Sequence, residues 1–198
     1  VKHIEKPRAH VQASDIPRVF QLATAAHDLA ADMAHIAFMT GKRAGNIVDM
    51  AWEDIDLNAT LWTTDYGDTK NDKKHSVALI DSTVEILLRQ ESAIQRQGRV
   101  FPAPEKSEGR HHTNIILERL KTVSGGAQTT HGLRHALKTF CSQAGYREDV
   151  RAVQLEHQKE GMSRIYDHAD FLPQRRLMME HWHDYLTGKT DLNEKARA

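Results

Sequence analysis

Strand character in this chain is confined to two short stretches that lie close together, and this confinement limits the fold more than any other feature. The stretches are TLWTT at 60–64 and HSVALI at 75–80. The turn-rich residues between them predict a hairpin or a three-strand meander. Most of the remaining chain carries apolar residues at helical spacing. The sequence therefore predicts a mainly α domain with a small antiparallel β-sheet, an α+β fold.

Local signals mark the ends of several predicted helices. Ser14 is a candidate N-cap for the first helix, and Pro17 suits its first turn. Gly41 suits a left-handed helix end after ADMAHIAFMT, and Asp81 can cap the helix that follows the hairpin. The last helix is expected over LPQRRLMMEHWHDYL at 172–186. Its apolar stripe is more typical of a core than of a contact surface, and contact with a second copy of the chain stays an alternative.

The stretch HGLRHALKTF at 131–140 combines an apolar stripe with a cluster of basic and proton-transferring groups. Leu133, Leu137 and Phe140 share one face of the predicted helix. His131 and Arg134 are three positions apart and share another face, on which they can converge on something outside the core. Arginine binds phosphate or carboxylate through a rigid fork, and histidine can move a proton near neutral pH. These residues predict an anion site with chemistry attached.

Composition limits the classes of protein to which the chain can belong. Its 198 residues suffice for one substantial core. The single Cys141 excludes an internal disulfide framework and fits a reducing compartment. No apolar run approaches the roughly 20 residues that span a bilayer. The 27 basic and 27 acidic residues balance, which argues against wholesale coating of nucleic acid but leaves a local basic site open.

Five stretches follow one another in an order typical of a known family. They are TGKRAGNIVDMAWEDID (40–56), DTKNDKKHSVAL (68–79), HGLRH (131–135), LEHQ (155–158) and SRIYDHAD (163–170). This set resembles the catalytic domain of the tyrosine recombinase (phage integrase) family, whose pattern is TGxRxxE with WxDID, a hairpin TK, HxLRH, LGH and then a nucleophilic tyrosine. The resemblance runs from about residue 14 to residue 187. The tail over 166–186 is similar to integrases of satellite phages and genomic islands.

The resemblance implies six catalytic residues: Arg43, Lys70, His131, Arg134, His157 and Tyr166. Arg43 and Arg134 would bind the non-bridging oxygens of the scissile DNA phosphate and stabilise the charge that develops there. Tyr166 would attack the phosphorus and form a 3′-phosphotyrosyl bond. That bond conserves the energy of the phosphodiester, so the 5′ hydroxyl of a second strand can reverse the step.

The other implied roles concern protons. Lys70 would protonate the 5′ oxygen as it leaves, although two lysines that follow it closely compete for this role. His131 and His157 would hold the phosphate and move the tyrosine proton, because a tyrosine with a pKa of about 10 is a poor nucleophile unaided. The resemblance implies no metal and no other cofactor. The histidine pairs at 111–112 and 181–183 have no cysteine or carboxylate at ligand spacing, so we expect no zinc there.

Two residues depart from the family pattern. Asn46 stands where the pattern has Glu, a residue that supports the site from behind the phosphate ligands. Glu156 stands where the pattern has Gly, immediately before His157. A carboxylate beside the phosphate site is expected to repel the substrate unless it points outward. Both departures raise the question of catalytic strength.

The resemblance implies site-specific recombination of double-stranded DNA at attachment sites, in the integration or excision of a mobile element. Two alternatives stay open: relaxation of DNA like that by a type IB topoisomerase, and a catalytically weak DNA-binding regulator of excision. The implied partners are DNA, a homo-tetramer that forms on DNA, and accessory DNA-bending or excision proteins. No membrane partner is expected, and the expected location is the bacterial cytoplasm.

The chain is expected to divide into three parts. Residues 1–12 are polar and aperiodic, which suggests a linker from N-terminal domains that the chain does not include. Residues 13–187 would form the catalytic domain, and residues 188–198 a polar C-terminal tail.

Overall fold

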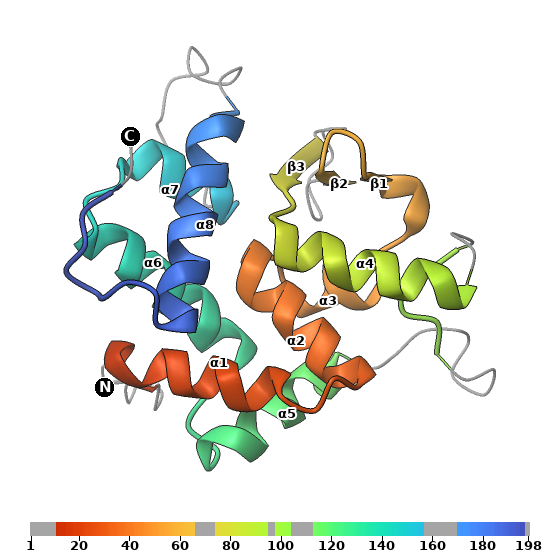
Figure 1. Ribbon diagram of the computed structural model, residues 1–198, viewed down its shortest axis with the longest axis horizontal. Coiled ribbons are helices and arrows are strands. Elements are labelled where there is room, and N and C mark those ends of the chain that lie inside the picture. The colour runs from red at the N-terminus through yellow and green to blue at the C-terminus, as the bar shows by residue number, and fades with distance from the viewer. Residues whose placement is uncertain (1–10, 66–73, 95–97, 104–112, 157–169, 197–198) are drawn as a thin grey trace, which may run out of the picture.

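Helices make up most of what the computed structural model describes, which is residues 11–65, 74–94, 98–103, 113–156 and 170–196 (Figure 1). In chain order the helices are α1 (Ile16–Thr24), α2 (Leu29–Thr40), α3 (Ala44–Val48), α4 (Asp81–Ile94), α5 (Asn114–Ser124), α6 (Thr130–Gln143), α7 (Glu148–Gln154) and α8 (Leu172–Thr187). The predicted fold class, mainly α with a small antiparallel sheet, is confirmed.

The sheet is a three-strand antiparallel meander in the order β1–β2–β3, one of the two forms that the sequence predicted. Its strands are β1 (Ile55–Asp56), β2 (Leu61–Asp65) and β3 (Lys74–Ala78). Trp62 pairs with Val77 across β2 and β3, and both side chains are fully buried. The next pair, Thr63 and Ser76, joins its hydroxyl groups at 2.8 Å. A slip of one residue would move the tryptophan to the opposite face, so this burial fixes the register.

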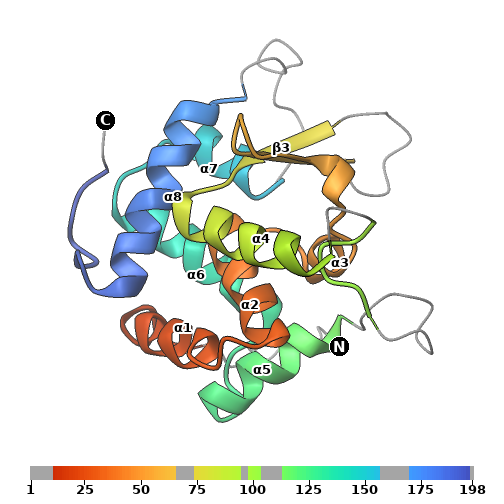
Figure 2. The same cartoon turned by 45° about the vertical axis from the view of Figure 1, so that its right-hand side comes forward.

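Helix α2 is the central element and contacts α1, α3, α4, α5, α6 and α8 (Figures 1 and 2). Its sequence, LAADMAHIAFMT, is apolar around most of the cylinder, which suits a helix buried on many sides. Asp28 caps its start by accepting a hydrogen bond from the Ala31 backbone N–H at 2.8 Å. This central position brings the C-terminal end of α2, with Lys42 and Arg43 just beyond it, to the middle of the molecule.

Gly41 ends α2 in the left-handed conformation, with φ of 64°, as predicted. A Cβ atom at this position would lie 2.9 Å from Leu137 Cδ2 on α6 and 3.1 Å from Leu155 Cδ2 after α7. Glycine therefore serves two purposes here: it permits the turn, and it lets α6 and the end of α7 approach the backbone.

The predicted cap at Ser14 is wrong. A short 3-10 turn over Ala13–Asp15 runs directly into α1, so Asp15 occupies the N-cap position and Ser14 lies inside the turn. Pro17 lies in the first turn, as predicted. The misplaced cap has a physical cause, because the 3-10 turn already provides backbone acceptors at the helix start.

The apolar stripe of α8 belongs to the core. The Trp182 indole donates a hydrogen bond to the Phe38 carbonyl oxygen at 3.0 Å. The ring of Phe140 on α6 lies 5.1 Å from that of Trp182 and 5.0 Å from that of Tyr185. Aromatic contacts of this kind join α8 to α6 and α2. The interpretation of the stripe as core is therefore confirmed.

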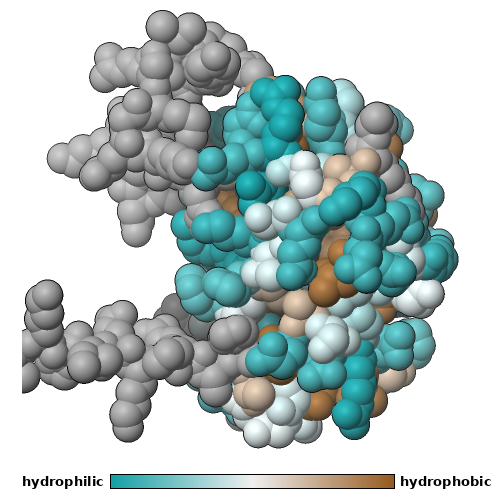
Figure 3. All heavy atoms as spheres, turned by 90° about the vertical axis from the view of Figure 1, so that its left-hand side faces the viewer, coloured by the Kyte–Doolittle hydropathy of each residue, from teal (hydrophilic) through white to brown (hydrophobic). Residues whose placement is uncertain are grey.

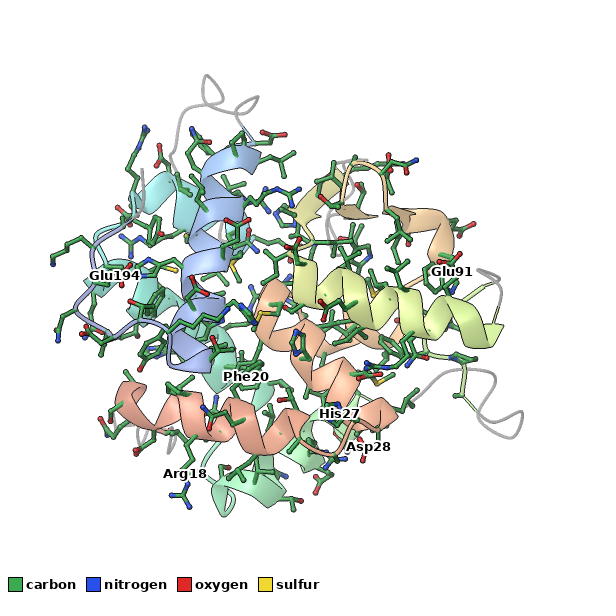
Figure 4. The ribbon with its side chains drawn as sticks, viewed as in Figure 1. Arg18, Phe20, His27, Asp28, Glu91 and Glu194 are labelled. Atoms are coloured by element: carbon green, nitrogen blue, oxygen red, sulfur yellow. The ribbon has the colours of Figure 1, made fainter. Side chains whose placement is uncertain are left out.

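The face drawn in Figure 3 is mainly hydrophilic, with small scattered hydrophobic patches. Among the large hydrophobic side chains in the described ranges, Leu22 and Leu88 are the exposed ones. Phe20, in contrast, lies between α1 and α2 (Figure 4), where its ring packs 5.1 Å from that of Phe38. Of the helices described, none combines the length and apolar character needed to cross a bilayer.

Candidate active site

Three of the six predicted catalytic residues can be located. Arg43 is the N-cap residue of α3, and His131 and Arg134 lie in the first two turns of α6. The other three, Lys70, His157 and Tyr166, fall outside the described residues. The described residues include the strands that flank 66–73 and the residues on either side of 157–169.

Arg134 is buried, with 7% of its surface exposed, and its guanidinium joins two distant parts of the backbone. One terminal nitrogen donates a hydrogen bond to the carbonyl oxygen of Gly41, and the other donates to that of Leu155. The expectation that Arg134 faces away from the core is therefore only partly right. The side chain reaches the backbone just after α2 and just after α7, next to which Arg43 and Glu156 lie.

His131 and Arg134 differ in exposure although they share a face of α6. His131 is exposed, because it lies in the first turn of the helix, one residue after its start at Thr130. Thr129 caps that start by accepting a hydrogen bond from the Gly132 N–H at 2.9 Å. The cap sets where the helix begins, and so sets the angle at which His131 leaves the surface.

Arg43 is bound at one end of its guanidinium by Glu156 and is exposed to solvent elsewhere. Its NH1 atom donates to Glu156 Oε2 at 2.5 Å, while 55% of the side chain remains exposed. Arginine carries five N–H donors in a flat fork, so one edge can be held by a carboxylate while another edge binds a second anion. Within the described part of the chain, no hydrogen bond joins Arg43 to the side chain of Asn46.

Glu156 points inward, so it does not adopt the outward orientation that was expected to avoid repulsion of the substrate. It is 6% exposed and has a positive φ of 52°. Its carboxylate lies 2.5 Å from Arg43 NH1, 2.6 Å from Lys42 Nζ and 3.1 Å from His75 Nδ1. Burial alone would raise the pKa of this carboxyl, but the hydrogen bond and positive charge of Lys42 oppose burial, and the pKa lies below its usual range. Glu156 is therefore ionised at neutral pH.

Lys42 is the buried partner of Glu156. Its ammonium also donates to Thr64 Oγ1 at 2.6 Å on β2 and to His75 Nδ1 at 2.7 Å on β3. The Trp62 ring lies 5.7 Å away, within the range of a cation–π contact. Burial lowers the pKa of Lys42 to about 8, against the opposing charge of Glu156. The lysine is therefore mainly protonated at neutral pH, and its charge is balanced inside the protein.

His75 connects the sheet to α7. Its Nε2 atom lies 2.8 Å from the Val153 carbonyl oxygen, which makes Nε2 the donor and leaves Nδ1 to accept from Lys42. Burial lowers the pKa of His75, so the neutral ring is favoured. The neutral ring with its proton on Nε2 satisfies both contacts.

Arg175 extends the buried polar cluster to α8. It is 1% exposed and donates to Gln154 Oε1 at 2.8 Å, to the Ser76 carbonyl oxygen at 2.7 Å and to the Asp170 carbonyl oxygen at 3.1 Å. Gln154 in turn donates to the Thr40 carbonyl oxygen at 2.7 Å. These bonds fix the start of α8 against β3 and α7, and so fix the chain where the segment 157–169 ends.

Sequence reasoning missed Lys42, His75 and Arg175 as parts of the site, and it misjudged Glu156. Lys42 and Arg175 stand beside residues of the recognised motifs, but a lysine or arginine there is ordinarily solvated. No pattern in the sequence indicates that His75 faces Lys42 across 33 positions of chain. The signal available in the sequence was the acid at position 156: if that acid is buried, it must have basic partners nearby.

The described part of the chain is a mainly helical domain in which buried arginine and lysine side chains lie near Arg43, which is half exposed. Three solved structures share its fold. The integrase from mycobacterium phage Brujita has a TM-score of 0.66 at 20% identity, over 100% of this chain and 62% of that one. The XerA recombinase has a TM-score of 0.63 at 18% identity, over 91% and 65% of the two chains. The XerH site-specific recombinase, bound to its palindromic difH substrate in a post-cleavage complex, has a TM-score of 0.60 at 22% identity, over 90% and 53%.

The chain belongs to the phage integrase family, because the model of that family matches residues 10–172. The prophage integrase IntA of Escherichia coli K12 is 30% identical over 148 residues, which are 74% of this chain and 36% of that protein. The integrase of Shigella phage Sf6 is 30% identical over 153 residues, which are 76% of this chain and 40% of that protein. The chain thus spans well under half the length of these two relatives. The family resemblance drawn from the sequence is confirmed.

Proposed function

We propose that this chain cleaves and rejoins DNA strands in site-specific recombination, during the integration or excision of a mobile element. The observation that carries the proposal is the pair of bonds from Arg134 to the carbonyl oxygens of Gly41 and Leu155. Those residues stand two positions before Arg43 and His157, respectively. Three stretches that each carry an expected phosphate ligand therefore approach one another, as a site for a single phosphate requires.

In the proposed reaction the Tyr166 oxygen attacks the phosphorus of a DNA phosphodiester. The bond from phosphorus to the 5′ oxygen breaks as the phosphotyrosyl bond forms, so the phosphate stays esterified throughout. Lys70 gives a proton to the departing 5′ oxygen, and a histidine, His131 or His157, accepts the tyrosine proton. Arg43 and Arg134 offset the charge on the non-bridging oxygens. Positive side chains provide the electrostatic stabilisation, so the proposed reaction uses no metal.

The proposed partners are double-stranded DNA at attachment sites, three further copies of the protein on that DNA, and accessory DNA-bending or excision proteins. The described binding of XerH to its difH substrate supports DNA as the substrate class. We further propose that residues 13–187 act as the catalytic domain, that 1–12 are a linker, that 188–198 are a tail, and that the protein works in the bacterial cytoplasm. Relationship to integrases of satellite phages and genomic islands stays a prediction.

The comparisons with recombinases and prophage integrases favour strand exchange over simple DNA relaxation or a non-catalytic regulator. A nicked suicide substrate separates these functions. Cleavage beside the nick releases a short fragment that carries the free 5′ hydroxyl, so the strand cannot be rejoined and a covalent adduct accumulates only if the protein cleaves. Adding a second DNA with a free 5′ hydroxyl should then convert the adduct into a joined recombinant strand. An adduct that rejoins only its own strand would indicate relaxation, and the absence of any adduct would indicate a binding protein.

A further inference from the structure

Glu156 has a backbone conformation that is unfavourable for residues with a Cβ atom. Its φ of 52° lies in the left-handed region, which glycine adopts without cost. A buried carboxylate is also costly unless positive partners surround it. Two unfavourable features at one residue are stable only if local contacts offset them, and such residues concentrate at functional sites.

The contacts of Glu156 divide between its two oxygens. Oε2 accepts from Arg43 NH1 at 2.5 Å, and Oε1 accepts from Lys42 Nζ at 2.6 Å. Arg43 is held at one end of its fork, with more than half of the side chain still open to solvent. The carboxylate thus fixes the inner end of an arginine whose outer side can bind a phosphate.

Lys42 links Glu156 to the sheet. Its ammonium donates to Glu156 Oε1, Thr64 Oγ1 and His75 Nδ1, and the His75 carbonyl oxygen lies 3.5 Å away. The side chain is fully buried, so it does not reach a DNA substrate. Thr64 lies near the end of β2 and His75 near the start of β3, the two strands that flank residues 66–73. Glu156 therefore connects Arg43, through Lys42, to strands β2 and β3.

We propose that Glu156 is a positioning residue of the phosphate site: its carboxylate orients Arg43 for the scissile phosphate and, through Lys42, fixes that arginine relative to strands β2 and β3. The proposal rests on the proposed function. It assigns to Glu156 the opposite effect from simple repulsion. Repulsion would make the acid a hindrance to the phosphate, whereas positioning makes it necessary for rapid cleavage.

The variant Glu156→Gln tests the proposal, because it removes the charge and keeps the size of the side chain. The measurements are the single-turnover rate of adduct formation on a nicked suicide duplex and the affinity for the same duplex. The cleavage rate should fall by roughly a hundredfold, the size of effect expected when a catalytic group is slightly misplaced. Affinity should fall much less than the rate, since the loss of a negative charge near the DNA offsets part of the affinity that the misplaced Arg43 loses.

Asp32→Asn is the matched control. Asp32 is a buried acid that lies 2.5 Å from the partly exposed Arg89, and the exposures of this pair, 6% and 49%, are close to the 2% and 55% of Glu156 and Arg43. The pair lies between α2 and α4. Its loss should lower the melting temperature as the loss of Glu156 does, and should leave the cleavage rate unchanged. Equal slowing by both variants would show that Glu156 acts only through stability and would overturn the proposal.

A carboxylate moved to position 46 provides the rescue. Asn46 lies three residues after Arg43, in the first turn of α3, where a glutamate can reach back to the helix start. Asn46→Glu in the Glu156→Gln background should restore part of the cleavage rate. It should not restore the melting temperature, because Lys42 stays without its partner. If it restores the melting temperature and not the rate, the role of Glu156 is structural.

A binding measurement separates failure of this proposal from failure of the proposed function. Arg43→Ala should weaken affinity for the duplex strongly in the native background and much less in the Glu156→Gln background, because a misplaced arginine has less affinity to lose. Equal losses in both backgrounds would overturn the positioning role even if the chain cleaves DNA. Absence of an adduct from the native chain, with this coupling intact, would overturn the proposed reaction and leave Glu156 as the residue that positions Arg43.

Discussion

The guanidinium of Arg134 donates a hydrogen bond to the carbonyl oxygen of Gly41, 93 positions earlier in the chain. Its other terminal nitrogen donates to the carbonyl oxygen of Leu155. One side chain thus holds the end of α2 against the end of α7, with Arg43 and Glu156 just beyond these two ends. A planar fork is needed to reach both acceptors at once.

Arg134→Lys should therefore fail although it keeps the positive charge. A single ammonium cannot serve both carbonyl oxygens, so one buried acceptor loses its donor at a cost of about 1–3 kcal/mol in the free energy of unfolding. Adduct formation should fall by roughly a hundredfold or more. Arg147→Lys is the control, since Arg147 is exposed and pairs with Asp149 on the surface. Cleavage by Arg134→Lys at the native rate would contradict this role.

Gly41→Ala should destabilise the fold more than the same change at another left-handed glycine. At Gly41, with φ of 64°, the new Cβ would lie 2.9 Å from Leu137 Cδ2. At Gly125, with φ of 63°, the new Cβ meets nothing within 4 Å. Gly125→Ala should therefore cost about 1 kcal/mol from backbone strain alone. Urea denaturation should show a larger loss at position 41, and equal losses would show that the close approach is unimportant.

His35 should make the fold sensitive to mild acid. Its ring packs against Phe20 at 5.4 Å, and burial lowers its pKa to about 4, with the charges of His183 and Arg89 adding to the effect. A histidine in the unfolded chain has a pKa of about 6.5, so between these values the unfolded state binds more protons. The free energy of unfolding should consequently fall as the pH drops from about 6.5 toward 4, by up to about 3 kcal/mol from this residue.

His35→Gln tests that expectation, because glutamine can keep the hydrogen bond to Ser82 Oγ, which lies 3.1 Å from the ring nitrogen in the native chain. The variant should lose less stability than the native chain between pH 6.5 and pH 4. Denaturant midpoints measured at several pH values would show this. Parallel curves for the two proteins would mean that His35 titrates in the folded state much as it does in the unfolded state.

The helices and the sheet could be predicted because their signals are local. Glycine at position 41, the alternating strands at 60–64 and 75–80, and the stripe of Leu133, Leu137 and Phe140 all indicate structure within a few residues of themselves. The N-cap prediction at Ser14 was wrong because it depends on more than the local residue. Whether a serine caps a helix depends on the turn that precedes it, and a 3-10 turn has weak sequence signals.

The chemistry of the site could be predicted only as a set of residue types. Family motifs indicated Arg43 and Arg134 as phosphate ligands, but not the burial of Arg134 or its two backbone acceptors. The inward orientation of Glu156 depends on Lys42 and His75, which the fold brings together from separate elements. Pairings of this kind follow from tertiary packing, so sequence spacing does not contain them.

Lys70 is the predicted general acid, and a sulfur substitution tests it. Lys70→Ala should nearly abolish cleavage of ordinary DNA, because a 5′ alkoxide leaves slowly without a proton. When sulfur replaces the bridging 5′ oxygen, the thiolate leaves unaided and the variant should recover most of its rate. Arg134→Ala should not recover, because its expected role concerns the non-bridging oxygens. Rescue of Lys73→Ala or His157→Ala instead of Lys70→Ala would place the acid elsewhere.

In the proposed reaction Tyr166 becomes covalently joined to DNA. The most direct measurement is capture of the native chain on a nicked suicide duplex, followed by protease digestion and mass mapping of the peptide that carries the nucleotide. One adduct is expected, on the peptide that contains Tyr166, and Tyr166→Phe should lose it completely while affinity for the duplex is retained. An adduct that persists in Tyr166→Phe and maps to Tyr146 or Tyr185, or no adduct from the native chain at all, would show that Tyr166 is not the nucleophile.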